Sequence, residues 1–247
     1  FVEDKLSIAG SVTISSYEGE SDSRNYIEFK KTNHTNYDTE PNQILENTSL
    51  DVLFVCVPNY LAPVVTLAGL TKGLHVFCEK PLSRSLKECK ELYELAKKNN
   101  VKLYVSDIEL FRNLKLRKNF REIKIFRGKK TDSSFRDLLY KLMYHDLYLI
   151  FDLVKDSKIN KISLEEKKNS IKILLYFKKK RIVFIYNRNL VKKIHKINNK
   201  ILIKRNNLIL KMFKYAFSDK SNFKDNKKRS LFCIKILNRI EKLINDK

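Results

Sequence analysis

Three short apolar runs alternate with two helix-like stretches between Asp51 and Asp107, and this rhythm constrains the fold more than any other feature. The first run, DVLFVCVP at residues 51–58, is continuous and ends at a proline, which is typical of a strand buried on both faces of a parallel sheet. The runs LHVFCE and VKLYVSD follow in turn. Strand, helix, strand, helix, strand at this spacing predicts right-handed βαβ crossovers and a parallel, doubly wound α/β sheet.

The two stretches between these runs have the pattern of helices. Residues 61–73, LAPVVTLAGLTKG, are compact and apolar and are closed by a glycine. In residues 83–100, Ser85 and Glu88 form a capping box, and one helical face carries Leu86, Cys89, Tyr93 and Ala96. Upstream, residues 11–17 read SVTISSY and predict a further strand.

The second half of the chain has a different pattern. Residues 133–154 predict a long helix with an apolar stripe, and residues 229–245 predict another. Between them, successive strands separated by charged turns predict a mostly antiparallel, open sheet: INKISL, SIKILLYF, RIVFIYNR and LVKKIHKI. We therefore expect a Rossmann-type domain at 1–106 and an α+β domain for substrate binding or oligomerisation at 107–247.

The formal net charge of +23 is concentrated in the second domain. No acidic residue occurs between Glu166 and Asp219, and such a field would attract phosphates or acidic sugars. Most of these lysines are equally consistent with solvated strand and helix faces that specify no partner. Tyrosines and phenylalanines interleave the lysines of residues 171–188, but aromatics at strand period are more often core than base-stacking platforms, so a nucleic-acid partner is not expected.

Several classes of protein are disfavoured by composition. No run approaches the roughly 20 apolar residues of a membrane span, and the first ten residues lack the profile of a signal peptide, so a cytoplasmic location without a membrane partner is expected. The four cysteines form no CxxC pair and predict reduced thiols. The four histidines show no HExxH-like spacing, and we predict no metal site.

Three segments in order, DVLFVCVPNYLAP, GLHVFCEKPLS and YHDLYLIFDL, resemble the glucose-fructose oxidoreductase, inositol dehydrogenase and MocA family. The specific part of the pattern is the order of three elements: a strand ending in PN, a helix, and a strand ending in EKP about twenty residues later. The resemblance implies a Rossmann domain that binds NAD or NADP and hydride transfer at a hydroxyl carbon of a sugar or nucleotide sugar. It also implies a second domain whose open sheet often forms a homo-oligomer face.

The EKP tripeptide carries the first candidate site. Ligands gather at the carboxyl ends of parallel strands, so a strand that ends at Cys78 delivers Glu79 and Lys80 to the cofactor crevice. Pro81 biases Lys80 toward an extended backbone and so fixes its direction. The resemblance implies that Lys80 is catalytic and holds both the substrate hydroxyl and the nicotinamide ribose. It assigns cofactor binding to Pro58, Asn59, Glu79 and Lys80.

The second candidate site lies on the predicted helix 133–154. Oxidation of an alcohol needs a base for the hydroxyl proton, and the resemblance assigns this catalytic role to His145. The alternative is a histidine packed among Tyr144 and Tyr148. Asp146 matches the HD of many family members, and we assign it to substrate binding. Lys141, one helical turn before His145, stands where many members have an aspartate; it would lower the pKa of the histidine or contact an acidic substrate.

Other positions depart from the family pattern. The sequence contains five glycines and no GxG, although a Rossmann site needs a glycine-rich turn for the pyrophosphate. We therefore expect the first strand and this turn to be missing from an N-terminally truncated Rossmann sheet, with GxGxxG encoded shortly before Phe1. Ala62 replaces a common histidine and Leu110 a common arginine. A catalytically decayed family member with a structural or assembly role thus stays open as the alternative.

Overall fold

The computed structural model describes residues 11–15, 26–30, 50–112, 114, 116–202 and 207–246. Contacts divide the chain into two compact units. The first comprises the residues up to Ser106 together with Phe213–Leu231, and the second comprises Asp107–Met212 and Phe232–Lys247. The predicted domains, 1–106 and 107–247, differ from these units in the segment Phe213–Leu231.

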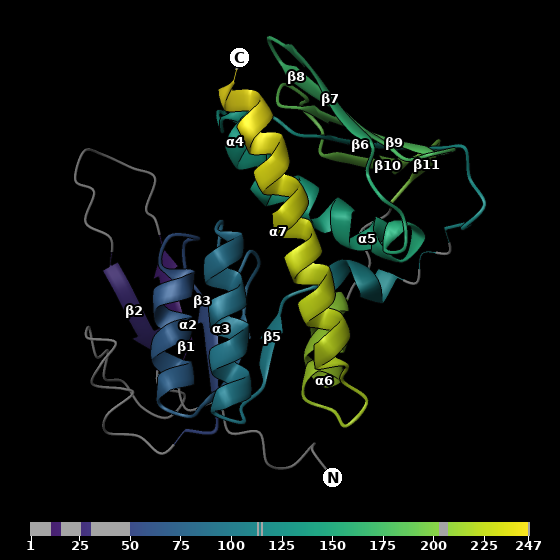
Figure 1. The fold of residues 1–247 in the computed structure, drawn as a ribbon. Coiled ribbons are helices and arrows are strands. Elements are labelled where there is room, and N and C mark those ends of the chain that lie inside the picture. Colours follow the sequence, from purple (N-terminus) through teal and green to yellow (C-terminus); the bar gives the residue numbers. More distant parts are fainter. Residues whose placement is uncertain are drawn as a thin grey trace. The chain divides into compact units, whose positions relative to one another are not determined.

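The first unit contains a five-stranded sheet with the order β2-β1-β3-β4-β5 (Figure 1). Strands β1, β3, β4 and β5 run parallel, and β2 joins β1 antiparallel. Helices α2 and α3 lie side by side on one face of this sheet (Figure 1). The bounds are β1 Ser11–Ser15, β2 Tyr26–Lys30, β3 Val52–Cys56, α2 Ala62–Thr71, β4 His75–Cys78, α3 Leu86–Lys98 and β5 Leu103–Val105. The predicted parallel, Rossmann-type sheet is confirmed.

Aromatic side chains cover the opposite face of this sheet. Phe54, Phe77 and Tyr104 occupy adjacent positions on β3, β4 and β5. Phe213, in helix α6 (Leu208–Ala216), packs on them, with its ring centroid 4.8 Å from that of Phe77 and 5.5 Å from that of Phe54. Phe217 adds a further ring, 5.4 Å from Phe54. A segment far along the chain therefore supplies the second apolar layer of the parallel sheet.

The backbone of the edge strand β5 forms hydrogen bonds with a side chain of helix α7 (Phe223–Asn245). The Asn226 amide accepts a hydrogen bond from Val105 N at 2.9 Å and donates one to Val105 O at 2.8 Å. Both polar groups of an edge residue are thus satisfied without a further strand.

The second unit is built on a six-stranded sheet with the order β11-β10-β6-β9-β8-β7 (Figure 1). Only the central pair β6 and β9 is parallel, so the prediction of a mostly antiparallel sheet is confirmed. Strand β6, which separates β9 from β10, was missed, although EIKIFRG alternates apolar and polar residues at its start. The bounds are β6 Glu122–Gly128, β7 Lys161–Lys167, β8 Ser170–Tyr176, β9 Arg181–Asn187, β10 Ile194–Ile197 and β11 Lys200–Ile201.

The long helix predicted at residues 133–154 is present but is not regular throughout. Ser134 caps it by accepting a hydrogen bond from Asp137 N at 3.1 Å. A first turn, α4 (Phe135–Leu138), leads into a π-helical turn, Leu139–Met143, and then into α5 (Tyr144–Val154). Such π turns interrupt helices rarely and often lie near functional residues.

Among the described residues, no helix combines the length and apolar character that crossing a membrane would require. The cytoplasmic location stays a prediction.

Candidate functional site

The first set of candidate residues lies at the carboxyl edge of β3 and β4. The two strands are parallel, and Val55 pairs with Cys78, so the residues that follow each strand reach the same edge. Glu79 N donates a hydrogen bond to Val55 O at 2.8 Å and extends this pairing by one residue. The structure therefore places Pro58 and Asn59 at the same sheet edge as Glu79 and Lys80.

Pro58 forms the turn that starts helix α2. Its carbonyl accepts hydrogen bonds from Leu61 N at 2.9 Å and from Ala62 N at 3.1 Å. The neighbouring Asn59 is half-buried. The exit of β3 is thus a fixed turn that contains Asn59.

The segment after Lys80 is fixed by the first turn of α3. Leu82 and Ser83 are buried, at 0% and 2% exposure. The Ser83 hydroxyl accepts from Ser85 N at 2.9 Å and donates to the Glu88 carboxylate, while Glu88 N donates to Ser85 Oγ at 3.3 Å. The predicted Ser85 N-cap is therefore present, but the Glu88 carboxylate accepts from the Ser83 hydroxyl and not from Ser85 N, so the capping box is not closed. These bonds hold a buried connection directly after the half-buried Lys80.

Cys56 ends β3 on the same edge, and its side chain is exposed. Partial burial raises the pKa of its thiol, and the nearby Glu79 carboxylate raises it further. The hydrogen bond from Glu79 N to Val55 O places Glu79 next to Cys56 on the neighbouring strand.

In the second unit, Asp146 is the centre of a buried polar cluster, which we call the Asp146 cluster. Arg127 Nε donates to both Asp146 carboxylate oxygens, at 2.9 and 3.0 Å, and an Arg127 terminal nitrogen lies 2.8 Å from Oδ1. The Tyr186 hydroxyl donates to Oδ2 at 2.9 Å, and His195 Nε2 lies 3.1 Å from Oδ1. Glu109 completes the cluster, with Oε1 3.1 Å from the Arg127 guanidinium.

Charged groups inside the Asp146 cluster shift one another's pKa values, and Glu109 also forms an ion pair with Arg112. Burial by itself raises the pKa of Asp146, but Arg127 and His195 outweigh this effect and hold the pKa below its usual value. Burial likewise lowers the pKa of Arg127, but the carboxylates of Asp146 and Glu109 outweigh it and raise that pKa. Burial and the Asp146 charge together raise the pKa of Tyr186 well above its usual value. Asp146 is thus a carboxylate held inside the fold by three sheet residues.

His145 precedes Asp146 on α5 and is half-buried. Successive helical residues point about 100° apart, so His145 does not face the sheet side chains that hold Asp146. The Asp146 cluster anchors the first turn of α5, and it thereby fixes the backbone from which His145 projects.

Lys141 lies on the π turn, with an exposed side chain whose Nζ donates to Ser133 Oγ at 3.0 Å. The π turn is closed by a hydrogen bond from Tyr144 N to Leu139 O, so Lys141 and His145 are not separated by a regular α-helical turn. The Tyr140 hydroxyl donates to Glu241 of α7 at 2.7 Å.

Four members of the Asp146 cluster were missed by sequence reasoning: Glu109, Arg127, Tyr186 and His195. Arg127 follows Ile123 and Ile125 at period two and so occupies a core-facing position of β6. A charged residue in such a position is a recognisable sign of a buried ion pair. The partner, however, could be identified only once β6, β9 and β10 were known to be neighbours.

The groups at the first sheet edge fit the nicotinamide end of a dinucleotide. Glu79, Lys80 and Asn59 offer a carboxylate, an ammonium group and an amide, which can bind ribose hydroxyls and a carboxamide. The sequence contains no GxG, the turn that holds the pyrophosphate in a Rossmann site. In the part of the chain that the structure describes, no group of three or more His, Cys, Asp or Glu side chains is placed to hold a metal ion.

The model of the oxidoreductase family with an NAD-binding Rossmann fold matches residues 17–107. Among characterised relatives, levoglucosan dehydrogenase of Pseudarthrobacter phenanthrenivorans is 33% identical over 58 residues, which are 24% of this chain and 15% of that protein. Myo-inositol 2-dehydrogenase of Thermotoga maritima is 29% identical over 85 residues, 34% of this chain and 24% of that protein. These matches span a quarter or less of the relatives' own length.

Solved structures resemble a larger part of the chain. The WlbA dehydrogenase from Thermus thermophilus, in complex with NAD and UDP-GlcNAcA, has a TM-score of 0.63 at 13% identity, covering 80% of this chain and 75% of that one. The MviM dehydrogenase from Clostridium difficile has a TM-score of 0.63 at 18% identity, covering 84% and 82%. UDP-N-acetylglucosamine 3-dehydrogenase GnnA from Acidithiobacillus ferrooxidans has a TM-score of 0.61 at 14% identity, covering 80% of both chains. At these identities the likeness establishes the fold.

Proposed function

Through residues 17–107 this chain belongs to the oxidoreductase family with an NAD-binding Rossmann fold, and we propose that it is a nicotinamide-dependent sugar dehydrogenase. In the proposed reaction a hydride passes between the cofactor and a hydroxyl-bearing carbon of a sugar or nucleotide sugar. The observation that carries the proposal is the placement of Glu79 and Lys80 at the carboxyl edge of β4, directly before a buried connection.

In this proposal the residues of the first unit bind and orient the cofactor and the substrate hydroxyl. Asn59 and the Pro58 turn line the nicotinamide side of the crevice, and Glu79 accepts hydrogen bonds from the cofactor. Lys80 donates hydrogen bonds to the ribose and to the substrate hydroxyl, and it polarises that hydroxyl as its proton leaves. NAD or NADP, when bound, supplies the hydride acceptor, so the carbon that loses the hydride becomes a carbonyl carbon.

His145 receives the hydroxyl proton in the proposed reaction, so that loss of one proton and one hydride oxidises the alcohol to a ketone. Lys141 is proposed to contact an acidic part of the substrate, which its exposed position on the π turn supports. The internal partners of Asp146 support a positioning role: it holds the turn of α5 that carries His145.

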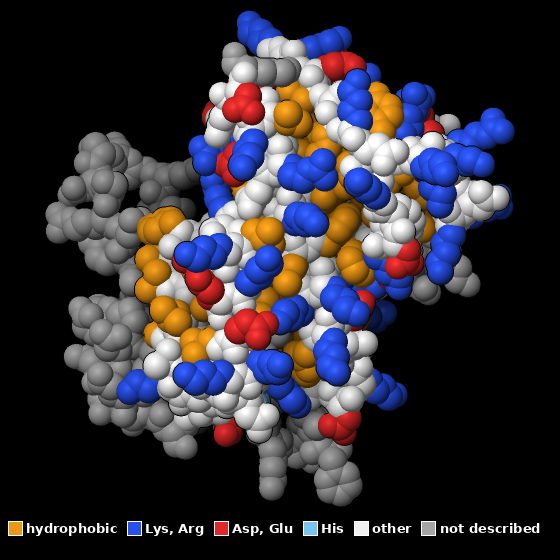
Figure 2. Space-filling model, in the orientation of Figure 1, with side chains coloured by type: hydrophobic (Ala, Val, Ile, Leu, Met, Phe, Trp, Pro, Cys, Tyr) orange, Lys and Arg blue, Asp and Glu red, His pale blue; other side chains and the backbone are white. Residues whose placement is uncertain are grey.

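A nucleotide sugar suits the charge of the second unit. Figure 2 shows lysine and arginine side chains distributed over the visible face, with few acidic ones between them. Such a surface raises the local concentration of a diphosphate-linked substrate. Two dehydrogenases of similar fold carry UDP-sugars in their names or complexes, which favours the same class here.

The open face of the six-stranded sheet is proposed as a homo-oligomer interface. Phe126, Ile185 and Ile194 lie on the face opposite the Asp146 cluster and are half-buried, and Ile201 is 61% exposed. Phe126 and Ile185 pair directly on this face, flanked by Lys196 and Lys172. Exposed apolar side chains of this kind support a surface that another chain covers.

Cofactor binding tests the proposal directly. The chain is titrated with NADH, NADPH and reduced nicotinamide mononucleotide, with nicotinamide fluorescence as the readout. The mononucleotide is included because it lacks the adenosine diphosphate that a glycine-rich turn would hold. We expect saturable binding that Lys80→Met weakens and the exposed Lys72→Met does not; binding that both variants retain would contradict the assignment of Lys80. Cofactor binding without turnover on any sugar would favour the catalytically decayed alternative, which Ala62, Leu110 and Lys141 support.

A further inference from the structure

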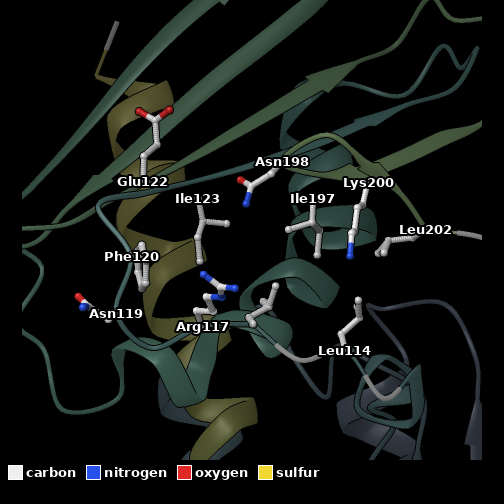
Figure 3. A pocket seen from close by; sticks show the side chains of 11 residues that line it. Leu114, Arg117, Asn119, Phe120, Glu122, Ile123, Ile197, Asn198, Lys200 and Leu202 are labelled. Atoms are coloured by element: carbon white, nitrogen blue, oxygen red, sulfur yellow. The ribbon is translucent and has the colours of Figure 1, made fainter.

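A pocket of about 600 Å³ opens in the second unit, and none of the candidate residues lines it (Figure 3). Its walls are the connection before β6, the first residues of β6, and the β10–β11 hairpin. The volume is within the range of small-molecule sites. Nothing in the proposed hydride transfer uses it.

The floor of the pocket is apolar. Ile123 and Ile197 form it and are 3% and 4% exposed. Phe120, Leu114 and Leu202 extend the apolar wall (Figure 3). Phe120, Leu114 and Leu202 are half-buried, so the apolar area that an aliphatic or aromatic body would cover lies mainly on this wall.

Nitrogen donors stand at the rim. The Arg117 guanidinium is directed toward Ile123, and the Lys200 ammonium group toward Leu114 (Figure 3). Asn198 is held by two hydrogen bonds to Lys124, one of which occupies its Oδ1 at 2.9 Å. Its Nδ2 is therefore available on the pocket side (Figure 3).

The acidic side chain of the lining does not cancel these charges. Glu122 forms an ion pair with Arg181, directly opposite it on β9. Because this pair neutralises the carboxylate, the net charge that the lining presents to a ligand comes from Arg117 and Lys200.

We infer that this pocket binds a small organic anion with an apolar body, an aliphatic or aryl carboxylate. The apolar part lies on Ile123 and Ile197. The carboxylate lies at the rim, between Arg117, Lys200 and the Asn198 amide. None of the candidate dehydrogenase residues lines this pocket, so the inference stands whether or not the chain transfers a hydride.

The absence of tryptophan from the sequence allows a site-specific reporter. Phe120 lines the pocket, and Lys180 Nζ lies 5.0 Å from its ring centroid, an arrangement that an indole ring retains. In Phe120→Trp the single tryptophan is titrated with octanoate and, as the uncharged matched ligand, with 1-octanol. Isothermal titration calorimetry of the unsubstituted chain with the same two ligands shows whether the Phe120→Trp substitution itself changes their affinities.

We expect saturable binding of octanoate and clearly weaker binding of 1-octanol. Arg117→Gln and Lys200→Met should each weaken octanoate binding about two- to fivefold, the range for exposed charge pairs, while the control Arg239→Gln on α7 leaves it unchanged. Equal binding of the acid and the alcohol would reduce the site to an apolar patch and overturn the inference. So would the absence of saturable binding, or affinities that both rim substitutions leave unaltered.

Discussion

The Arg127 guanidinium and the Asp146 carboxylate form an ion pair at 2.8 Å within the second unit, where their side chains are 9% and 0% exposed. Tyr186 and His195 surround the same carboxylate. A charge pair this deeply buried contributes little net stability as a pair, but each partner is costly to leave alone. Its evident consequence is geometric, because it fixes α5 to β6 at the turn that carries His145.

Removing the Arg127 guanidinium alone should therefore strongly destabilise the fold. Arg127→Met leaves the Asp146 carboxylate buried without its cation, and we expect the free energy of unfolding to fall by about 3–5 kcal/mol. Denaturant unfolding followed by circular dichroism measures it. The control Arg181→Met breaks an exposed pair and should cost at most about 1 kcal/mol. The double variant Arg127→Met/Asp146→Leu should recover much of the loss; a double variant as unstable as Arg127→Met would refute the ion-pair explanation.

The lowered pKa of Asp146 predicts an acid dependence of stability. Its folded-state pKa lies below the unfolded value of about 3.9, so its contribution is present above that pH and is lost as pH falls toward the folded-state pKa. The free energy of unfolding should thus fall more steeply below about pH 4 in the natural chain than in Arg127→Met/Asp146→Leu. Parallel curves for the two proteins would show that Asp146 carries no such linkage.

The raised pKa of Tyr186 predicts a loss of stability at alkaline pH. Its pKa is raised in the folded state, so its contribution is complete below the unfolded value of about 10 and is lost as pH rises through the folded-state pKa. Tyr186→Phe removes this titration and one hydrogen bond to Asp146. We expect it to be less stable than the natural chain at neutral pH but to lose less stability between about pH 9 and 11. Denaturant unfolding at each pH measures the difference, and an unchanged alkaline slope would exclude the effect.

Thiol labelling reports on the first sheet edge. Cys56 is exposed, whereas Cys78, Cys89 and Cys233 are buried, and burial raises the pKa of Cys89 to about 12. A thiol-reactive chromogenic disulfide should modify Cys56 first and the other three only on unfolding. Because Cys56 ends β3 beside Glu79, saturating reduced nicotinamide mononucleotide should slow that modification. A labelling rate indifferent to the nucleotide would place the ligand elsewhere.

Local patterns predicted most of the fold. The continuous run at 51–58 and the Ser85 N-cap need only neighbouring residues to be read, and the structure has a strand and a helix start there. The role of helix α6 was missed because it depends on a distant partner, Phe77, on which Phe213 packs. Strand β6 was missed although its alternation is local; only the pairing of Arg127 with Asp146 needed the fold.

One candidate site could likewise be predicted from local sequence, and the other could not. Glu79 and Lys80 follow a strand directly, so their edge of the sheet could be predicted from sequence. The neighbours of Asp146 could not, since three of them come from β6, β9 and β10, whose order in the sheet is not readable from local periodicity.

The proposed role of Lys80 is tested most directly by the rate of NADH formation from a panel of UDP-sugars, followed at 340 nm for the natural chain, Lys80→Met and Lys72→Met. We predict turnover of at least one UDP-sugar, a loss of about 100-fold or more in kcat/KM with Lys80→Met, and no loss with Lys72→Met. Turnover that Lys80→Met retains in full would contradict the central role assigned to this lysine.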